Sequence, residues 1–132
     1  MARFVAPSDA RSLGLPGRVS QEIVSGAHGG ALGVTLRRVE IAVASPDSPA
    51  RGAHHHADFE ECIYVLAGRG TTFAGDREYP LAAGDTILIP PREPHVTRNT
   101  GDTPLVLLCF FPVADVARGT QEPGAGVLPP KS

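Results

Sequence analysis

Apolar and polar residues alternate in short runs along the chain, and this pattern predicts β-strands rather than helices. No long stretch repeats apolar residues at the three- and four-residue spacing of an amphipathic helix. Turns that contain Gly and Pro separate the runs. We therefore expect about eight to ten short strands, eight of which we place at residues 19–24, 33–43, 61–67, 71–74, 77–81, 86–89, 95–99 and 105–111.

Two of these runs carry further detail. The alternation in residues 33–43 slips once, between Leu36 and Val39, and a β-bulge would explain the slip. Residues 105–111 (LVLLCFF) are continuously apolar, which is typical of a strand buried on both faces. Many short strands with frequent turns indicate an all-β sandwich or barrel.

A length of 132 residues fits one domain of ordinary size. We expect a flexible N-terminal arm over residues 1–17, a barrel over 18–116 and a disordered, Gly- and Pro-rich tail over 117–132. We also expect a homodimer, because residues 19–24 would leave an exposed edge strand that a second copy could cover.

Charge and composition exclude several function classes. The formal net charge of −2 gives no basic footprint for nucleic acid. No apolar run is long enough for a membrane helix, and residues 1–14 lack the apolar core of a secretory signal. Cys62 and Cys109 indicate two reduced thiols in a cytoplasmic protein, although a disulfide between them remains open.

Three histidines and one carboxylate form the candidate metal site. In an extended segment His54 and His56 point to one face and His55 to the other. Glu61 opens the next strand, and His95 follows a Pro-rich corner. Three imidazoles and a carboxylate suit a borderline divalent ion such as Fe(II), Mn(II), Ni(II), Co(II) or Zn(II).

Two segments carry a resemblance to the cupin superfamily. Residues 54–68 (HHHADFEECIYVLAG) resemble its first motif, and residues 84–99 (GDTILIPPREPHVTRN) resemble its second. The motif glycines correspond to Gly68 and Gly84, the proline to Pro90 and the asparagine to Asn99. Two turn positions depart from the pattern, because Ser48 and Arg92 stand where the superfamily usually has glycine.

The resemblance implies a double-stranded β-helix, or jelly-roll, barrel of the small single-domain type. It also implies one metal per chain, held by His54, His56, Glu61 and His95, with two positions open to substrate or water. It gives His55 no role as a ligand, and we assign no role to His28. Gly68 and Gly84 would allow tight corners at strand ends.

We expect a metal-dependent enzyme acting on a small organic substrate that chelates the ion. Oxidoreductase chemistry of the dioxygenase type is favoured, with Fe or Mn ahead of Zn, Ni or Co. A non-redox isomerase, lyase or polyketide cyclase is one alternative, and a small-molecule-binding protein without catalysis is another. The sequence identifies no catalytic residue beyond the metal ligands, and it does not name the substrate.

Overall fold

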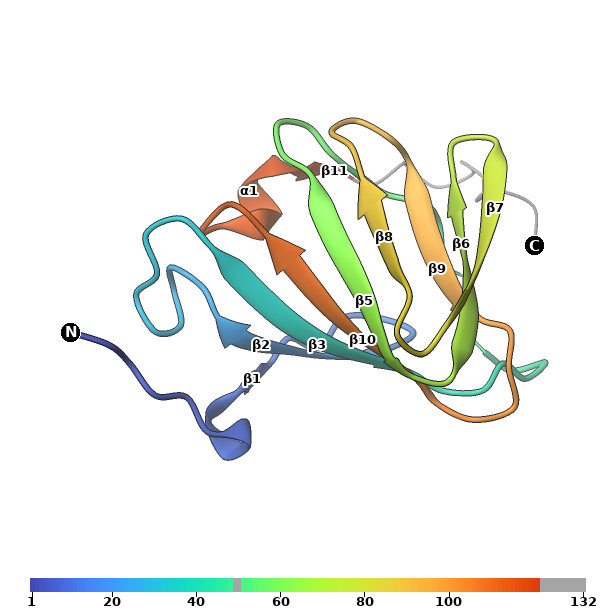
Figure 1. Ribbon diagram of the computed structural model, residues 1–132, viewed down its shortest axis with the longest axis horizontal. Coiled ribbons are helices and arrows are strands. Elements are labelled where there is room, and N and C mark those ends of the chain that lie inside the picture. The colour runs from blue at the N-terminus through green and yellow to red at the C-terminus, as the bar shows by residue number, and fades with distance from the viewer. Residues whose placement is uncertain (49–50, 122–132) are drawn as a thin grey trace.

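Two antiparallel sheets carry most of the chain in the computed structural model, which describes residues 1–48 and 51–121 (Figure 1). The larger sheet has the order β1-β2-β3-β10-β5-β8, and the smaller has the order β7-β6-β9. The strands of the larger sheet are β1 (Arg11–Ser12), β2 (Val19–Val24), β3 (Thr35–Ile41), β10 (Leu105–Phe111), β5 (Glu61–Ala67) and β8 (Thr86–Ile89). Those of the smaller sheet are β7 (Arg77–Ala82), β6 (Arg69–Ala74) and β9 (His95–Asn99).

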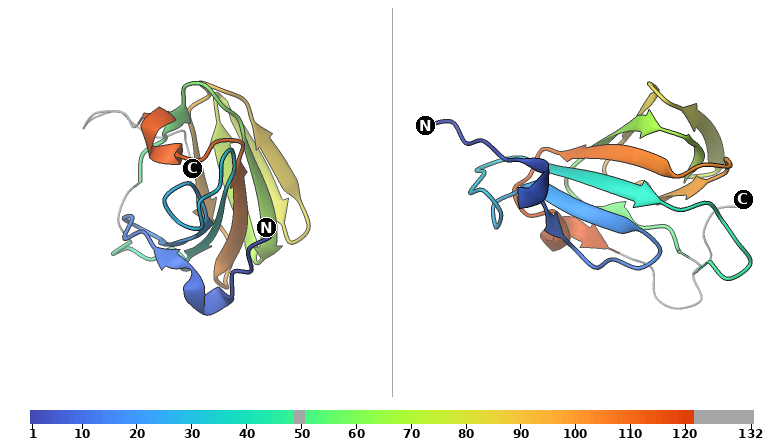
Figure 2. Two further views of the ribbon diagram at one scale, coloured as in Figure 1. Left: turned by 90° about the vertical axis from the view of Figure 1, so that its left-hand side faces the viewer. Right: turned by 90° about the horizontal axis from the view of Figure 1, so that it is seen from below.

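Short elements complete the fold. They are the 3₁₀-helix η1 (Pro7–Asp9), the helix α1 (Val116–Gly119) and the two-residue strands β4 (His55–His56) and β11 (Thr120–Gln121), which pair with one another. The turned views show the strands arranged around a common axis (Figure 2). The prediction of an all-β barrel is confirmed.

The slip in alternation between Leu36 and Val39 was wrongly interpreted as a bulge. The register between β3 and β10 runs without interruption from Leu105–Ile41 to Phe111–Thr35. The irregularity lies instead in β2, between Glu22 and Val24. Strand β3 keeps a regular alternation in which Arg37 takes an inward position, and this polar residue interrupted the apolar pattern.

Strand β10 is buried mainly on its inner face. Leu105, Leu107, Cys109 and Phe111 lie in the core, whereas the side chain of Phe110 is 40% exposed. On the outer face Val106 is buried, Leu108 is partly buried and Phe110 is exposed, so the prediction of burial on both faces holds at Val106 and is wrong at Phe110.

Both ends of the barrel chain extend beyond the predicted boundaries. Within the segment expected as an arm, β1 pairs with Gln21 and Glu22 of β2, so the edge of β2 is partly covered. Within the segment expected as a tail, residues 117–121 belong to α1, which begins at Val116, and to β11. Residues 122–132, the remainder of that predicted tail, lie outside the described residues.

The core lies between the two sheets and consists of alternating inward side chains, as the period-two pattern requires. Ile63 and Val65 of β5 are buried in it, while Tyr64 between them is exposed. Both cysteines are free thiols, so the alternative of a disulfide is not borne out. Over residues 1–48 and 51–121, no helix has the length and apolar character needed to cross a membrane.

Candidate metal centre

The structure brings together all four residues that the sequence suggested as ligands. One potential ligand atom from each of His54, His56, Glu61 and His95 lies within 4.8 Å of the others. Backbone pairing holds two of these residues in register, since His54 N donates to His95 O at 3.0 Å and His95 N donates to His54 O at 2.8 Å. Glu61 begins β5, and His95 begins β9.

Strand alternation selects which histidines face inward. His56 is buried, and His54 contacts it edge to face at 5.1 Å between ring centroids. His55 points to the other side, where its Nε2 lies 3.1 Å from Gln121 Oε1 in an exposed contact. His55 is therefore placed away from the cluster, as the extended geometry predicts.

Hydrogen bonds on the far side of two rings fix where their protons lie. Thr120 Oγ1 donates its single proton to Val116 O at 2.6 Å, so it accepts the Nδ1–H of His56 at 2.8 Å. A carbonyl only accepts, so His95 Nδ1–H donates to Glu93 O at 2.9 Å. In the neutral rings both Nε2 atoms therefore carry lone pairs directed at the cluster.

These lone pairs provide a test of whether the site fits a metal. The two Nε2 atoms lie 3.1 Å (His56) and 3.0 Å (His95) from the same Oε1 of Glu61, so three electron-rich atoms converge. A proton on either ring would reduce the repulsion between these lone pairs at that ring only. A divalent cation would instead bind the ligand atoms of all four residues at once, including His54. Oxygen and imidazole donors of this kind suit a borderline transition metal.

Electrostatics favour the ligating protonation states. Burial alone would raise the pKa of Glu61, but hydrogen bonds from His56 and His95, made when their Nε2 atoms carry protons in place of a metal, outweigh it and hold the pKa at about 2. Burial, together with the nearby His95, lowers the pKa of His54 to about 3. At neutral pH Glu61 is therefore a carboxylate and His54 a neutral imidazole, the forms that bind metals.

The cluster lies in a cavity of about 710 Å³. Apolar side chains line the wall near the cluster, including Ile63, Leu107 and Phe111. The N-terminal segment, the 25–27 turn and the α1 segment supply further lining residues, among which Arg11, Arg18, Ser25 and Asp115 are polar or charged. The last two segments contact each other directly, since Gly26 N donates to Ala114 O at 2.9 Å.

Sequence reasoning missed three residues of this cavity. Arg37 was hidden by the bulge interpretation, although an arginine at an inward phase of β3 was the available signal. Thr120 lay in the segment assigned to the tail, and nothing in its surroundings indicated a contact with His56. Cys109 faces the cluster and hydrogen-bonds Glu61, and burial raises the pKa of its thiol well above the ordinary value. Arg38, by contrast, faces outward and pairs with Glu40.

The turn residues of the two motifs set the backbone conformation of the corners. Gly68 and Gly84 have positive φ of 83° and 94°, as their predicted corners require. Arg92, at the position where the superfamily usually has glycine, is the one non-glycine residue of the described chain with positive φ, at 68°. It keeps the same turn conformation, and its side chain donates to Ala57 O at 3.2 Å. Asn99 ties the loop before β10 by donating to Thr103 O at 2.8 Å.

Comparison with known proteins gives one family and several relatives. The family model for the cupin domain matches residues 38–111. An uncharacterised protein of Methanocaldococcus jannaschii is 43% identical over 56 residues, which cover 42% of this chain and 45% of that protein. A glucose-6-phosphate isomerase of Thermococcus gammatolerans is 38% identical over 66 residues, covering 45% of this chain and 35% of that enzyme.

An oxalate-binding protein of Thermotoga maritima is 33% identical over 66 residues, covering 50% of this chain and 54% of that protein. The chain thus spans about half or less of the length of these relatives. Among solved structures, the oxalate decarboxylase of Lactobacillus farciminis in complex with formate superposes with a TM-score of 0.71 at 23% identity. That match covers 86% of this chain and 33% of the decarboxylase, and it shows the shared fold.

Proposed function

This chain belongs to the cupin domain family, and from that premise we propose that it is a metal-dependent enzyme acting on a small organic anion that chelates the metal. The observation that carries the proposal is the position of four donor atoms, within 4.8 Å of one another, in a cavity large enough for an organic substrate. Cavities of a few hundred cubic ångströms that combine an apolar wall with a few convergent polar groups are typical ligand sites.

In the proposed enzyme, one set of residues would bind the metal and another would line the substrate cavity. His54, His56, Glu61 and His95 would hold one divalent ion, with Fe or Mn favoured and Zn, Ni or Co as alternatives. When bound, such an ion supplies a Lewis acid or, for Fe and Mn, redox chemistry with O₂. The apolar wall formed by neighbours of the cluster would exclude bulk water from the bound substrate.

Charge supports an anionic substrate. Four arginines line the cavity against three carboxylates, which leaves one net positive charge, and a divalent ion would raise that to three. The arginines are Arg11, Arg18, Arg37 and Arg51, and the carboxylates are Glu22, Glu61 and Asp115. A positively charged cavity with low-dielectric walls attracts and orients anions.

Within this proposal, we rank three possible functions of the site, and dioxygenase chemistry is the first. An isomerase, lyase or polyketide cyclase that uses the metal as a Lewis acid is the second, and the relative that is a glucose-6-phosphate isomerase supports keeping it. Binding without turnover is the third, supported by the relative that is an oxalate-binding protein. A shared fold does not decide among these.

Metal analysis and spectroscopy test the proposal. We expect close to one metal per chain in protein purified without a His-tag. Oxalate added to the Co(II)-loaded protein should change the visible spectrum, because the chelator would take exchangeable positions. A closed tetrahedral spectrum that oxalate does not perturb would make the metal structural and refute the enzyme. Oxygen uptake with chelating organic acids on the Fe(II)-loaded protein separates the dioxygenase from the other readings.

We also propose a homodimer in the cytoplasm, a compartment that suits two free thiols. Since β1 covers part of the β2 edge, the outer face of the larger sheet is the better surface for a second copy. The strand registers align Leu36, Phe110, Cys62 and Leu88 in a row across that face, and Leu88 is 55% exposed. Sedimentation at micromolar concentration should show a dimer, and Leu88→Lys should shift it toward monomer.

A further inference from the structure

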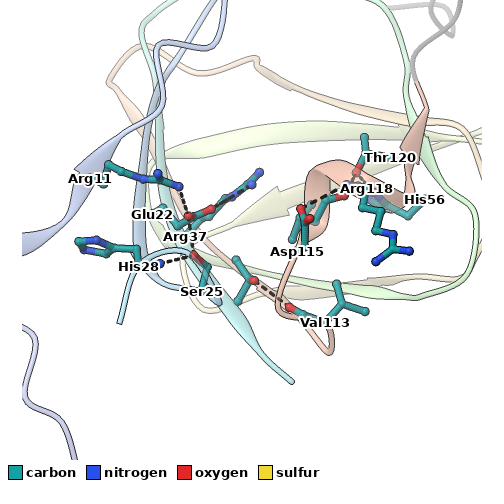
Figure 3. A network of polar contacts seen from close by, with 12 residues as sticks. Arg11, Glu22, Ser25, His28, Arg37, His56, Val113, Asp115, Arg118 and Thr120 are labelled. Carbon is teal, nitrogen blue, oxygen red and sulfur yellow. Dashed lines mark hydrogen bonds and ion pairs between the residues drawn. The ribbon is translucent and has the colours of Figure 1, made fainter. Parts of the chain in front are cut away.

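An ion-pair cluster centred on the buried Glu22 lies in the cavity wall and includes none of the candidate metal ligands. Glu22 of β2 is 4% exposed, and its carboxylate accepts hydrogen bonds from Arg11, Arg37 and Ser25 (Figure 3). Ser25 Oγ donates to Glu22 Oε2 at 2.6 Å. Burial would raise the pKa of Glu22, but these donors lower it, so Glu22 is a fixed negative charge between two arginines.

The geometry of Arg37 leaves one edge of its guanidinium available. Nε and Nη2 both donate to Glu22 Oε1, at 3.2 Å and 3.1 Å. The remaining group, Nη1, has no hydrogen-bond acceptor among residues 1–48 and 51–121. A guanidinium that a carboxylate already holds on one side is preorganised. A ligand that binds its other side therefore causes little further loss of side-chain rotational freedom.

Arg37 shares the inner face of the sheet with the metal cluster. Cys109 of β10 pairs with Arg37 on one side and with Ile63 of β5 on the other, and all three line the cavity. With neighbouring strands about 4.8 Å apart, the Cα atoms of Arg37 and Ile63 are separated by roughly 10 Å. Glu61 lies two residues from Ile63 on that same face of β5.

One aromatic ring joins Arg37 to the ligands. The guanidinium carbon of Arg37 lies 5.5 Å from the centroid of the Phe111 ring, a cation–π arrangement. The same ring meets His56 edge to face, at 5.3 Å between centroids. An apolar surface thus separates a fixed cation from the metal cluster within one cavity.

We infer that Arg37 binds a second anionic group of the substrate. The ligand class is an organic acid with a chelating head at the metal, an apolar body against Phe111 and a carboxylate or phosphate at Arg37. The inference rests on the proposed function, because the head group needs an open metal. It makes Arg37 a specificity-determining residue, and it assigns the cavity to substrates longer than the two-carbon acid oxalate.

Matched chelators test the inference on the wild-type protein. Benzohydroxamic acid supplies a chelating head with an apolar body, and its meta- and para-carboxy derivatives add the distal anion. The methyl esters of those derivatives have similar size without the charge. We expect at least one carboxylate to bind the Co(II)-loaded protein about ten- to one-hundred-fold more tightly than its ester, as for a hydrogen bond to a charged group. Equal affinity of acid and ester for both isomers would overturn the inference.

Variants then assign the effect to Arg37. Arg37→Gln should abolish the preference for the acid while leaving benzohydroxamic acid within about twofold, and Arg37→Lys, which keeps the charge, should retain part of it. Arg38→Gln is the matched control, because this neighbour on β3 faces outward toward Glu40. A preference that survives in both Arg37 variants would assign the second anion to another group and refute the role of Arg37.

The two levels of the proposal fail in different ways. If oxalate and benzohydroxamic acid leave the Co(II) spectrum unchanged, the metal is closed and the proposed function fails, along with the inference that rests on it. If both perturb the spectrum while acid and ester bind alike, the open metal site stands and only the distal anion site is refuted.

Discussion

Substitution of Thr120 by valine should weaken metal binding without touching a ligand. Valine keeps the shape of threonine but removes Oγ1, which accepts the Nδ1–H of His56 at 2.8 Å. Loss of the acceptor leaves a buried N–H unsatisfied, which costs about 1–3 kcal/mol. The ring can avoid that cost by rotating or by moving its proton to Nε2, and either change removes the lone pair that faces the metal.

Two independent magnitudes give the expected size of the effect: the loss of metal affinity at Nε2 and the cost of the unsatisfied N–H at Nδ1. Loss of an outer partner of a metal-bound histidine typically lowers metal affinity about ten- to one-hundred-fold. That factor corresponds to about 1.4–2.8 kcal/mol, inside the range for the orphaned N–H. We therefore expect the Kd for Zn(II) or Co(II), measured by competition with a chromogenic chelator, to rise by one to two orders of magnitude in Thr120→Val.

Thr72→Val is the control for this prediction. Thr72 is fully buried and shares a hydrogen bond of 2.7 Å with Thr97, but it contacts none of the four candidate ligands. The substitution Thr72→Val should lower thermal stability about as much as Thr120→Val does, but it should change the metal Kd by less than about twofold. Equal metal affinities in Thr120→Val, Thr72→Val and the wild type would refute the reasoning that Thr120 fixes the His56 ring.

Four further outcomes are expected. His56→Ala should remove most of the metal, whereas His55→Ala should retain it; metal analysis showing the reverse would contradict the strand alternation. Glu61→Gln should keep the fold, by circular dichroism, and lower metal affinity at least about tenfold, since the site loses its only formal negative charge. In metal-free protein, stability should fall with acidification: the unfolded chain protonates His54 below pH about 6.5 but the folded chain only near 3, and Glu61 extends the loss from about 4.5 down to about 2. Thermal melts that stay level between these limits would contradict the pKa directions. Arg92→Gly should leave the melting temperature nearly unchanged, because relief of the positive φ offsets the added freedom of the unfolded chain and the lost contact with Ala57.

Local pattern was enough to predict the longer strands and the common face of His54 and His56, and the motif resemblance added Glu61 and His95; the two-residue strands β1, β4 and β11 were not predicted. Alternation along a strand is a property of the backbone, so the phase of His54 and His56 could be read without a fold. Pairing of distant segments is not local: the contact of Thr120 with His56 joins residues 64 apart, and no spacing rule reports it.

Polar residues at inward positions caused the other error. Arg37 occupies a core phase of β3 because Glu22, on the neighbouring strand, neutralises it. A pattern based on hydrophobicity counts such a residue as a break, and so Arg37 was interpreted as part of a bulge. The residues that a binding cavity requires are therefore those most easily misread by a method that looks for an apolar core.

The pairing of β4 with β11 also sets an order of events during synthesis. When the growing chain has emerged from the ribosome as far as His95, all four candidate ligands have emerged, but Thr120 has not. Until that segment docks, His56 lacks the acceptor that fixes its ring, so the nascent chain should capture metal weakly and exchange it readily. Retention of the ion would begin only when residues 120–121 join the barrel, so the site would select its metal late in folding, after all four candidate ligands are in place.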